Sequence, residues 1–289
     1  MHKTSIYFKT KTNLINELEK NESIVTLKKQ SFLKKLPFLK KDYADIYFHS
    51  GVLDNEAILN IKNSKKTIVN SKHLKADILD KIDILKEKIE VIYPSINMIY
   101  KKPKEVKEKL CKKFDIDSTP KIILFTAKNL KSAGIKEFFE IITSLSSMNK
   151  QIIISSDKNQ ITNLKFLIAK YNFGDEVLLL EDYPNINELF LAADIFILPT
   201  HNKSFAINVL KAMYCKCAVI ASSTNYASEL LDVFATMESP SDSATSYKID
   251  ALLSRNNDLK HIQKENRRIA KEYQLDKNLD KLTSIIKTI

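Results

Sequence analysis

The chain has 289 residues, of which 44% are hydrophobic, and 46 basic side chains against 35 acidic ones give it a formal net charge of +11. Folding a chain of this length buries about three-quarters of its extended surface, enough for two domains with their own cores. This composition excludes disordered and fibrous proteins. The three glycines lie too far apart for a glycine-rich phosphate loop, and no apolar run reaches the roughly 18 residues of a membrane-spanning helix.

The positive charge comes almost entirely from lysine, since arginine occurs at only three positions near the C-terminus. Nucleic-acid readers more often use arginine forks, so we expect no nucleic-acid partner. Cys111, Cys215 and Cys217 are odd in number, and the first residues contain no apolar stretch typical of a signal peptide. We therefore expect a cytoplasmic protein with structural thiols and no bound metal.

Short apolar runs in the first third, several of them β-branched, predict buried strands at 6–8, 24–27, 46–48, 67–69 and 90–93. Between the last two, residues 71–86 carry apolar side chains at helical spacing. A lysine-rich helix is predicted at 104–114. Strands at 122–126, 152–155, 177–180, 195–198 and 218–221 then alternate with helices at 135–147, 160–171, 186–193, 205–214 and 227–233.

A weak strand at 235–237 precedes helices out to residue 289. This alternation predicts an α/β fold with parallel, doubly wound sheets, which bind ligands beyond the carboxyl ends of their strands. The candidate residues are those that follow each strand, although position alone gives candidates only and an ordinary turn without a ligand explains each of them. They are His49 and Ser50, Asn70 and Ser71, Lys128, Ser156 and Asp157, residues 181–183, residues 200–204, and residues 222–224.

The segment at 189–222, LFLAADIFILPTHNKSFAINVLKAMYCKCAVIAS, resembles the donor-binding signature of the retaining GT-B glycosyltransferases of family 4, the glycosyl transferases group 1. Other parts of that family's pattern occur in the same order. They are VIYPSIN at 91–97, ILFTAKNLKSAGIKEFF at 123–139, EDYPNINEL at 181–189 and the glutamate of YASELL at 229.

The resemblance implies two Rossmann-like domains, the first of them shorter than is usual in the family. We expect an acceptor-side domain at 1–96, a nucleotide-sugar-binding domain at 97–275, and a final helix at 276–289 able to return to the first domain. It also implies a donor-binding set that consists of Lys128, Lys131, Tyr183, Thr200, Lys203, Ser204, Phe205, Ala206, Lys211 and Glu229.

The chain departs from the family's pattern in the donor site. Lys203 and Lys211 stand where the family has two glutamates that accept hydrogen bonds from the donor sugar and the ribose, so two acceptors become donors. Ser204 to Ala206 replace a G-F-G backbone whose glycines let the main chain approach the donor. Of the family's basic pair for the diphosphate, Lys128 remains, Ala133 replaces the second member, and Lys131 lies near enough to substitute.

The first domain offers an acceptor residue and a candidate membrane-binding segment. DIYFHS at 45–50 resembles a segment whose histidine lies at the family's acceptor cleft, which makes His49, with Lys128, a candidate catalytic residue. The segment KKQSFLKKLPFLKK at 28–41 alternates lysine pairs with bulky apolar residues. It is consistent either with peripheral docking on an anionic membrane or with a surface helix that packs on the sheet.

Two functions follow from these observations. The first is transfer of a sugar from a nucleotide-sugar to a glycan or lipid-linked acceptor in the synthesis of envelope polysaccharide or glycolipid, as a retaining hexosyltransferase that needs no cofactor. The second is a glycosyltransferase-like protein without catalysis that serves as a partner or glycan-binding module, which the two lysine replacements and the short first domain favour.

Overall fold

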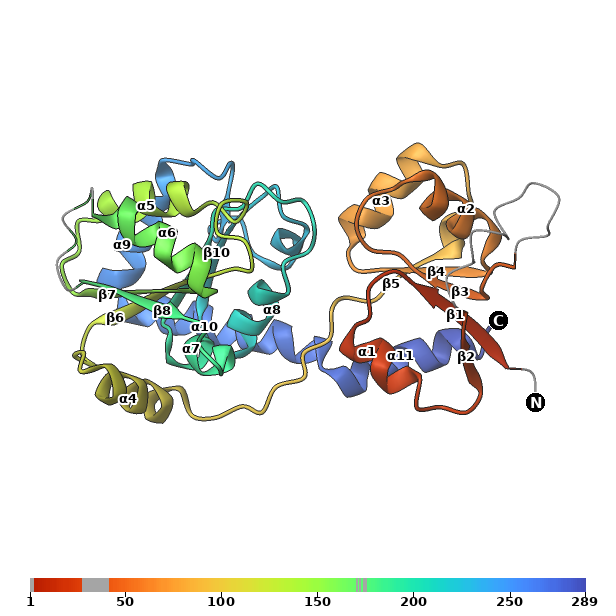
Figure 1. Cartoon of the computed structure of the whole chain (residues 1–289), viewed down its shortest axis with the longest axis horizontal. Helices are drawn as coiled ribbons and strands as arrows, with labels where there is room; N and C mark the ends of the chain where they lie inside the picture. Colours follow the sequence, from red (N-terminus) through yellow and green to blue (C-terminus); the bar gives the residue numbers. More distant parts are fainter. Residues whose placement is uncertain (1–2, 28–41, 170, 172, 174–175) are drawn as a thin grey trace. The chain divides into compact units, whose positions relative to one another are not determined.

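The computed structural model describes residues 3–27, 42–169, 171, 173 and 176–289, and it divides into two compact α/β units (Figure 1). The first unit contains Met1–Asn97 and Tyr273–Ile289, and the second contains Met98–Glu272. The expected boundaries lay after residues 96 and 275. The segment 28–41, for which we expected membrane docking or a surface helix, lies outside the described residues.

The first unit is built on a five-stranded parallel sheet with the order β2-β1-β3-β4-β5. Its strands are β1 (Thr4–Phe8), β2 (Ile24–Thr26), β3 (Ile46–Phe48), β4 (Lys66–Val69) and β5 (Ile89–Val91). All five predicted strands are confirmed. Between them lie α1 (Asn13–Leu18), α2 (Asn55–Asn63) and α3 (Lys72–Lys81), of which only α3 was predicted.

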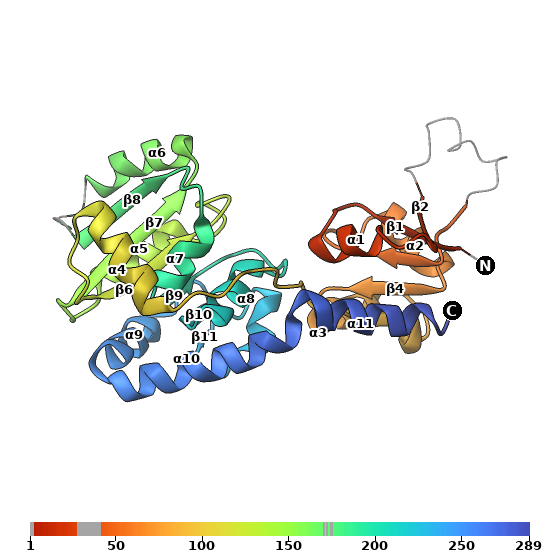
Figure 2. The same cartoon turned by 90° about the horizontal axis from the view of Figure 1, so that it is seen from below.

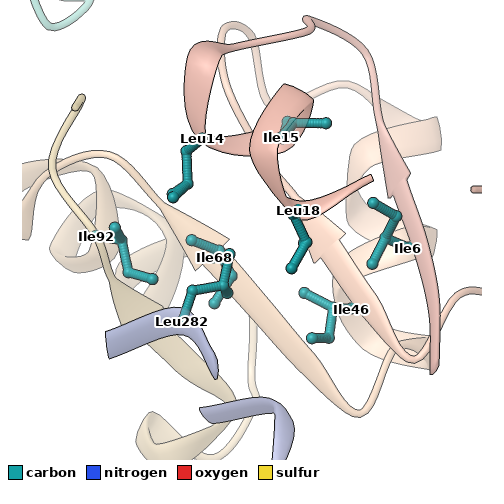
Figure 3. Packing of buried hydrophobic residues seen from close by; sticks show 8 residues of the cluster. All are labelled: Ile6, Leu14, Ile15, Leu18, Ile46, Ile68, Ile92 and Leu282. Carbon is teal, nitrogen blue, oxygen red and sulfur yellow. The ribbon is translucent and has the colours of Figure 1, made fainter. Parts of the chain in front are cut away.

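The core of this unit includes side chains from the far end of the sequence. Leu14, Ile15 and Leu18 of α1 pack with buried residues of the sheet, and Leu282 of α11 (Leu275–Ile286) joins the same cluster (Figure 3). In the cartoon, α11 packs beside α1 (Figure 1). Asn278 anchors it further, since its Nδ2 donates to the Tyr93 carbonyl and to the Ser95 Oγ, both at 2.9 Å.

The second unit is built on a six-stranded parallel sheet with the order β11-β10-β9-β6-β7-β8. Its strands are β6 (Lys121–Thr126), β7 (Lys150–Ser156), β8 (Val177–Glu181), β9 (Ile195–Leu198), β10 (Ala218–Ser222) and β11 (Thr236–Met237). Every residue of β9 and β10 is buried, as the continuous apolar runs predicted.

Helices of the second unit cover this sheet, and α10 runs beside α8 and β10 (Figure 2). They are α4 (Pro103–Phe114), α5 (Ile135–Thr143), α6 (Lys158–Ile168), α7 (Ile186–Ala192), α8 (Ile207–Tyr214), α9 (Ala244–Ser254) and α10 (Asn256–Ala270). The three cysteines, Cys111, Cys215 and Cys217, are buried free thiols, as predicted.

Two predicted helices differ from the structure at the carboxyl edge of this sheet. The helix expected at 205–214 begins only at Ile207, and the helix expected at 227–233 is a short 3₁₀ helix, η4, at Tyr226–Leu230. Both begin beside Asn225, whose side-chain oxygen accepts from the backbone N–H of Ala206 and of Ala227. N–H groups at a helix start have no carbonyl of their own helix to bond, so Asn225 caps the beginning of both helices.

Lys216, in the turn between α8 and β10, has a backbone φ of 66°. This left-handed conformation favours glycine. The turn between α8 and β10 therefore holds a lysine in a backbone conformation that glycine adopts more readily.

Candidate functional site

Most of the candidate donor-site residues gather at the carboxyl edge of the six-stranded sheet. The loops after β6, β9 and β10 lie on strands that are neighbours in the sheet. They carry Lys128 and Lys131, residues 200–206, and the turn that leads to Glu229 in η4. The sheet order thus brings together segments that lie about 100 residues apart in the chain.

One buried side chain organises the loop after β9. Asn225, which is 1% exposed, donates from Nδ2 to the carbonyls of Asn202 (2.9 Å) and Ser204 (2.6 Å). Its Oδ1 accepts from the backbone N–H of Ala206 at 3.1 Å and of Ala227 at 3.0 Å. Four hydrogen bonds from one amide therefore fix the segment that replaces the family's G-F-G backbone.

A second network joins all three loops. The Thr200 hydroxyl donates to the Ser132 carbonyl at 2.9 Å, and the Ser222 hydroxyl donates to the Thr200 carbonyl at 2.5 Å. Gln160 of α6 holds the loop after β6, because its Oε1 accepts from Leu130 N at 2.6 Å and its Nε2 donates to the Lys128 carbonyl at 2.7 Å. Thr200, a predicted donor-binding residue, thus has a hydroxyl already engaged in holding the loops.

Gly134 lies where two of these loops meet, and its φ is 86°. A Cβ at this position would stand 1.8 Å from the Pro199 carbonyl oxygen. Gly134 is therefore required both for its backbone conformation and for the close approach of the loop after β9.

Unpaired cations line this edge. Lys128, Lys131 and Lys203 are exposed, and none of them has an acidic partner among the residues that the structure describes. Lys211 on α8 is half-buried, and burial lowers its pKa. Phe205 is buried, while Ser204 is exposed and Ala206 half-buried. The edge is therefore suited to an anionic ligand.

Tyr183 lies apart from these residues, in the loop after β8, which β7 separates from β6. Its hydroxyl donates to Glu188 at 3.1 Å, and Lys113 Nζ lies 4.7 Å from the centre of its ring. The side chain lines a groove of about 420 Å³ beside α4 and α7. The structure thus places Tyr183 in a groove beside α4. The sequence predicted this helix but not the groove.

His49 lies in the first unit, directly after β3, and is 3% exposed. Its Nδ1 lies 3.3 Å from the Tyr47 hydroxyl. Burial, and to a lesser degree the charge of Lys9, lowers the pKa of His49 to about 4, against a smaller opposing effect of Asp54. His49 is therefore neutral at physiological pH.

Sequence reasoning missed the residues that hold the site together, namely Asn225, Gln160 and Tyr47. Asn225 alone carried a local signal, because an asparagine just before an expected helix start is a common cap. Among residues 3–27, 42–169, 171, 173 and 176–289, no three His, Cys, Asp or Glu side chains are grouped to hold a metal. No helix in these ranges is long and apolar enough to cross a bilayer.

Two Rossmann-like α/β units with parallel sheets define the GT-B class of glycosyltransferase folds, and the chain has this fold. The sequence model of the family "Glycosyl transferases group 1" matches residues 106–269, more than half of the chain. The chain therefore belongs to that family, as the motifs at 91–229 had indicated.

One curated relative is a Campylobacter jejuni protein, N,N'-diacetylbacillosaminyl-diphospho-undecaprenol alpha-1,3-N-acetylgalactosaminyltransferase. It is 35% identical over 120 residues, which cover 41% of this chain. The match spans 30% of the relative's length.

Solved structures share the fold. A glycosyltransferase from Rickettsia africae is similar over 99% of this chain and 90% of its own, with a TM-score of 0.74 and 21% identity. Anabaena Alr3699/HepE in complex with UDP is similar over 84% of this chain and 72% of its own, with a TM-score of 0.72 and 14% identity. At such identities the likeness concerns the fold alone.

Proposed function

We propose that the protein transfers a sugar from a nucleotide-sugar donor to a glycan or lipid-linked acceptor, with retention of configuration and without a metal ion. The observation that carries the proposal is the carboxyl edge of the six-stranded sheet. There, three loops from neighbouring strands are held by buried side chains and present exposed lysines to solvent. A nucleoside diphosphate has the charge that such an edge favours.

In this proposal the loops position the donor, and the lysines stabilise charge. Lys128, with Lys203, would neutralise the diphosphate as the bond to the sugar breaks, which is where negative charge develops. Residues 204–206 would contact the donor mainly through their backbone, because Asn225 already fixes that segment. His49 would contact the acceptor from the first unit.

The relatives support both the nucleotide-sugar donor and the lipid-linked or glycan acceptor. The Campylobacter protein's name describes a sugar transferase that acts on a diphospho-undecaprenol substrate, and the Anabaena structure was solved with UDP. By analogy we propose UDP-linked donors and lipid-linked or glycan acceptors for this chain.

A second function, binding without turnover, is favoured by Lys203 and Lys211, which stand where the family has glutamates. In that case the protein would retain ligand affinity and serve as a partner or glycan-binding module. Ligand binding and sugar transfer must therefore be measured separately.

Calorimetry with UDP and GDP tests the donor site. We expect saturable binding in the micromolar to millimolar range, weakened in Asn225→Asp. This near-isosteric change keeps the oxygen that accepts from Ala206 and Ala227 but removes both donors to the loop. Asn208→Asp, which removes a single bond to the Thr126 carbonyl, is the matched control.

Absence of binding by any nucleoside diphosphate at millimolar concentration would reject the donor site. Binding without release of UDP from UDP-sugars in the presence of acceptors would select the second function.

Cytoplasmic location and contact of residues 28–41 with an anionic membrane stay predictions. Co-sedimentation of Phe32→Ser/Phe38→Ser with acidic vesicles tests the latter, since this variant keeps the charge and removes the apolar groups.

A further inference from the structure

The loop after β6, which carries Lys128, is held from the neighbouring strand β7. The two strands pair Thr126 with Ser155. Ala127 and Ser156 follow them side by side, and the Ser156 hydroxyl donates to the Ala127 carbonyl at 3.0 Å. The junction between β7 and α6 therefore lies directly against the loop.

The side-chain amide of Gln160, in the first turn of α6, contacts the same loop at two points. Its Oε1 accepts from Leu130 N at 2.6 Å, and its Nε2 donates to the Lys128 carbonyl at 2.7 Å. These bonds lie on both sides of Asn129, so one amide satisfies a carbonyl and an N–H group of the same main-chain segment. They fix the backbone from which the Lys128 side chain extends.

Asp157 holds the Gln160 amide in this orientation. Its Oδ2 accepts from Gln160 Nε2, and its Oδ1 caps α6 by accepting from Gln160 N at 3.0 Å. A reversed amide would bring oxygen against this carboxylate and nitrogen against the Leu130 N–H group. Nε2 has a third, longer contact of 3.1 Å with Ser156 Oγ. The orientation of the Gln160 side chain thus follows from its surroundings.

The same contacts occupy the carboxylate that lies near Lys128. One nitrogen of Gln160 bonds both the Lys128 carbonyl and Asp157, so the carboxylate is close to the Lys128 backbone. The hydrogen bonds from Gln160 lower the pKa of Asp157, which is therefore ionised. Within the described part of the chain, Lys128 nevertheless has no acidic partner, and its side chain is exposed. Both Asp157 oxygens accept from Gln160 instead.

We propose that Gln160 is a positioning residue for Lys128. It holds the backbone of the loop and occupies Asp157, and it thereby presents a free ammonium group to the diphosphate of a nucleotide-sugar. A cation that is already placed and unpaired binds at little cost, because no loop has to be ordered and no ion pair has to be broken. The inference deepens the proposed function and rests on it in one respect, namely that Lys128 binds the diphosphate.

A double-mutant cycle in the full chain tests whether Gln160 acts through Lys128. Calorimetry with UDP compares the wild type, Gln160→Met, Lys128→Met and the double variant. We expect about fivefold weaker binding in Gln160→Met and at least about tenfold weaker binding in Lys128→Met, the effects of a neutral and a charged hydrogen bond. The double variant should bind no more than about twofold more weakly than Lys128→Met, because Gln160 then has no cation to position.

Gln263→Met is the matched control for the loss of an amide. Gln263 of α10 donates from Nε2 to the Asp194 carbonyl at 3.1 Å, just before β9 and thus at the opposite edge of the sheet. This variant should bind UDP as the wild type does. A comparable loss in the control, or losses that add in the double variant, would overturn the inference and leave the proposed function standing. Absence of UDP binding by the wild type would overturn both.

Gln160→Glu separates the two contributions and serves if the methionine variant does not fold. It keeps the acceptor for Leu130 N–H, so hydrogen exchange at that amide should stay slow, whereas in Gln160→Met it should become about tenfold faster. UDP should nevertheless bind more weakly to Gln160→Glu than to Gln160→Met, because a second carboxylate beside Asp157 would pair with Lys128. Wild-type affinity in Gln160→Glu, or equal exchange at Leu130 in both variants, would overturn the inference.

Discussion

The carboxyl edges of the two sheets are built from the same kind of strand but present opposite chemistry. At the five-stranded sheet His49 and Tyr47 are almost fully covered and neutral, and the charges nearest to them, Lys9 and Asp54, pair with each other. At the six-stranded sheet the buried groups, Asn225 and Ser222, only hold the loops, and the charged groups Lys128 and Lys203 stand in solvent. One edge is thus suited to a neutral ligand and the other to an anion.

The difference follows from the hydrogen bonds that the buried side chains make at each edge. At the six-stranded sheet, the Asn225 side chain makes four hydrogen bonds within the fold, which leaves ligand binding to exposed cations. At the five-stranded sheet, His49 Nε2 and Asn70 Oδ1 have no hydrogen-bond partner within the described part of the chain. Buried polar groups whose hydrogen bonds are all made within the fold give a rigid frame. Buried polar groups without a partner favour a ligand that can supply the missing hydrogen bonds.

The largest effect is expected from Gly134→Ala, compared with Gly51→Ala in the first unit. Both glycines have positive φ, at 86° and 93°, but an added Cβ meets the Pro199 carbonyl only at Gly134 and meets nothing within 4 Å at Gly51. Gly134→Ala should lower the free energy of unfolding by about 3 kcal/mol and abolish UDP binding. Gly51→Ala should cost about 1 kcal/mol.

Urea unfolding and calorimetry with UDP measure these two effects. Equal losses of stability in the two variants would mean that the loops after β6 and β9 can separate without cost. The rigid frame assigned to the six-stranded sheet would then be wrong.

The next effect concerns the neutrality of the five-stranded edge. The pKa of His49 is about 4 in the folded chain, against 6.5 for an ordinary histidine, so the unfolded chain binds the proton more tightly. Stability therefore rises with pH between about 4 and 6.5, and it falls by about 3 kcal/mol as the pH drops through that window.

In urea unfolding across this pH range, His49→Gln should remove that part of the pH dependence. His261→Gln, at an exposed position of α10, is the matched control and should retain it. If both variants have the same slope as the wild type, His49 is not held neutral by burial.

The smallest expected effect tests whether the lysines of the six-stranded edge contribute to ligand binding. Lys211 is half-buried, and burial lowers its pKa. Its charge therefore opposes folding, and this cost disappears only as the pH rises toward the pKa of an ordinary lysine. Lys211→Met should raise the free energy of unfolding by about 1 kcal/mol at pH 7 and weaken UDP binding. Lys203→Met, at an exposed position, should change stability by less than about 0.5 kcal/mol.

Thermal or urea unfolding, paired with calorimetry, distinguishes the two lysines. A stabilised Lys211→Met variant with unchanged UDP affinity would show that Lys211 does not contribute to ligand binding. The cationic character of the edge would then rest on the loop lysines alone.

The sequence by itself determined the strands, their order along the chain, the family and most of the loops at which ligands bind. Apolar runs such as 122–126 and 195–198 are local, and burial on both faces of a parallel sheet leaves them few alternatives. The motif at 189–222 likewise located the loop that carries Lys203, because strand end, turn and helix are contiguous there.

Only the tertiary structure decided what each side chain does at those loops. Asn225 reaches a loop 20 residues away, and Tyr183 turns to Glu188 and α4, because the contacts available to a polar side chain depend on which strands become neighbours. The protonation of His49 likewise depends on burial by distant residues and on a hydroxyl that only the folded strand orients. Such long-range packing leaves no periodic signal in the sequence, so the chemistry of both edges emerges only on folding.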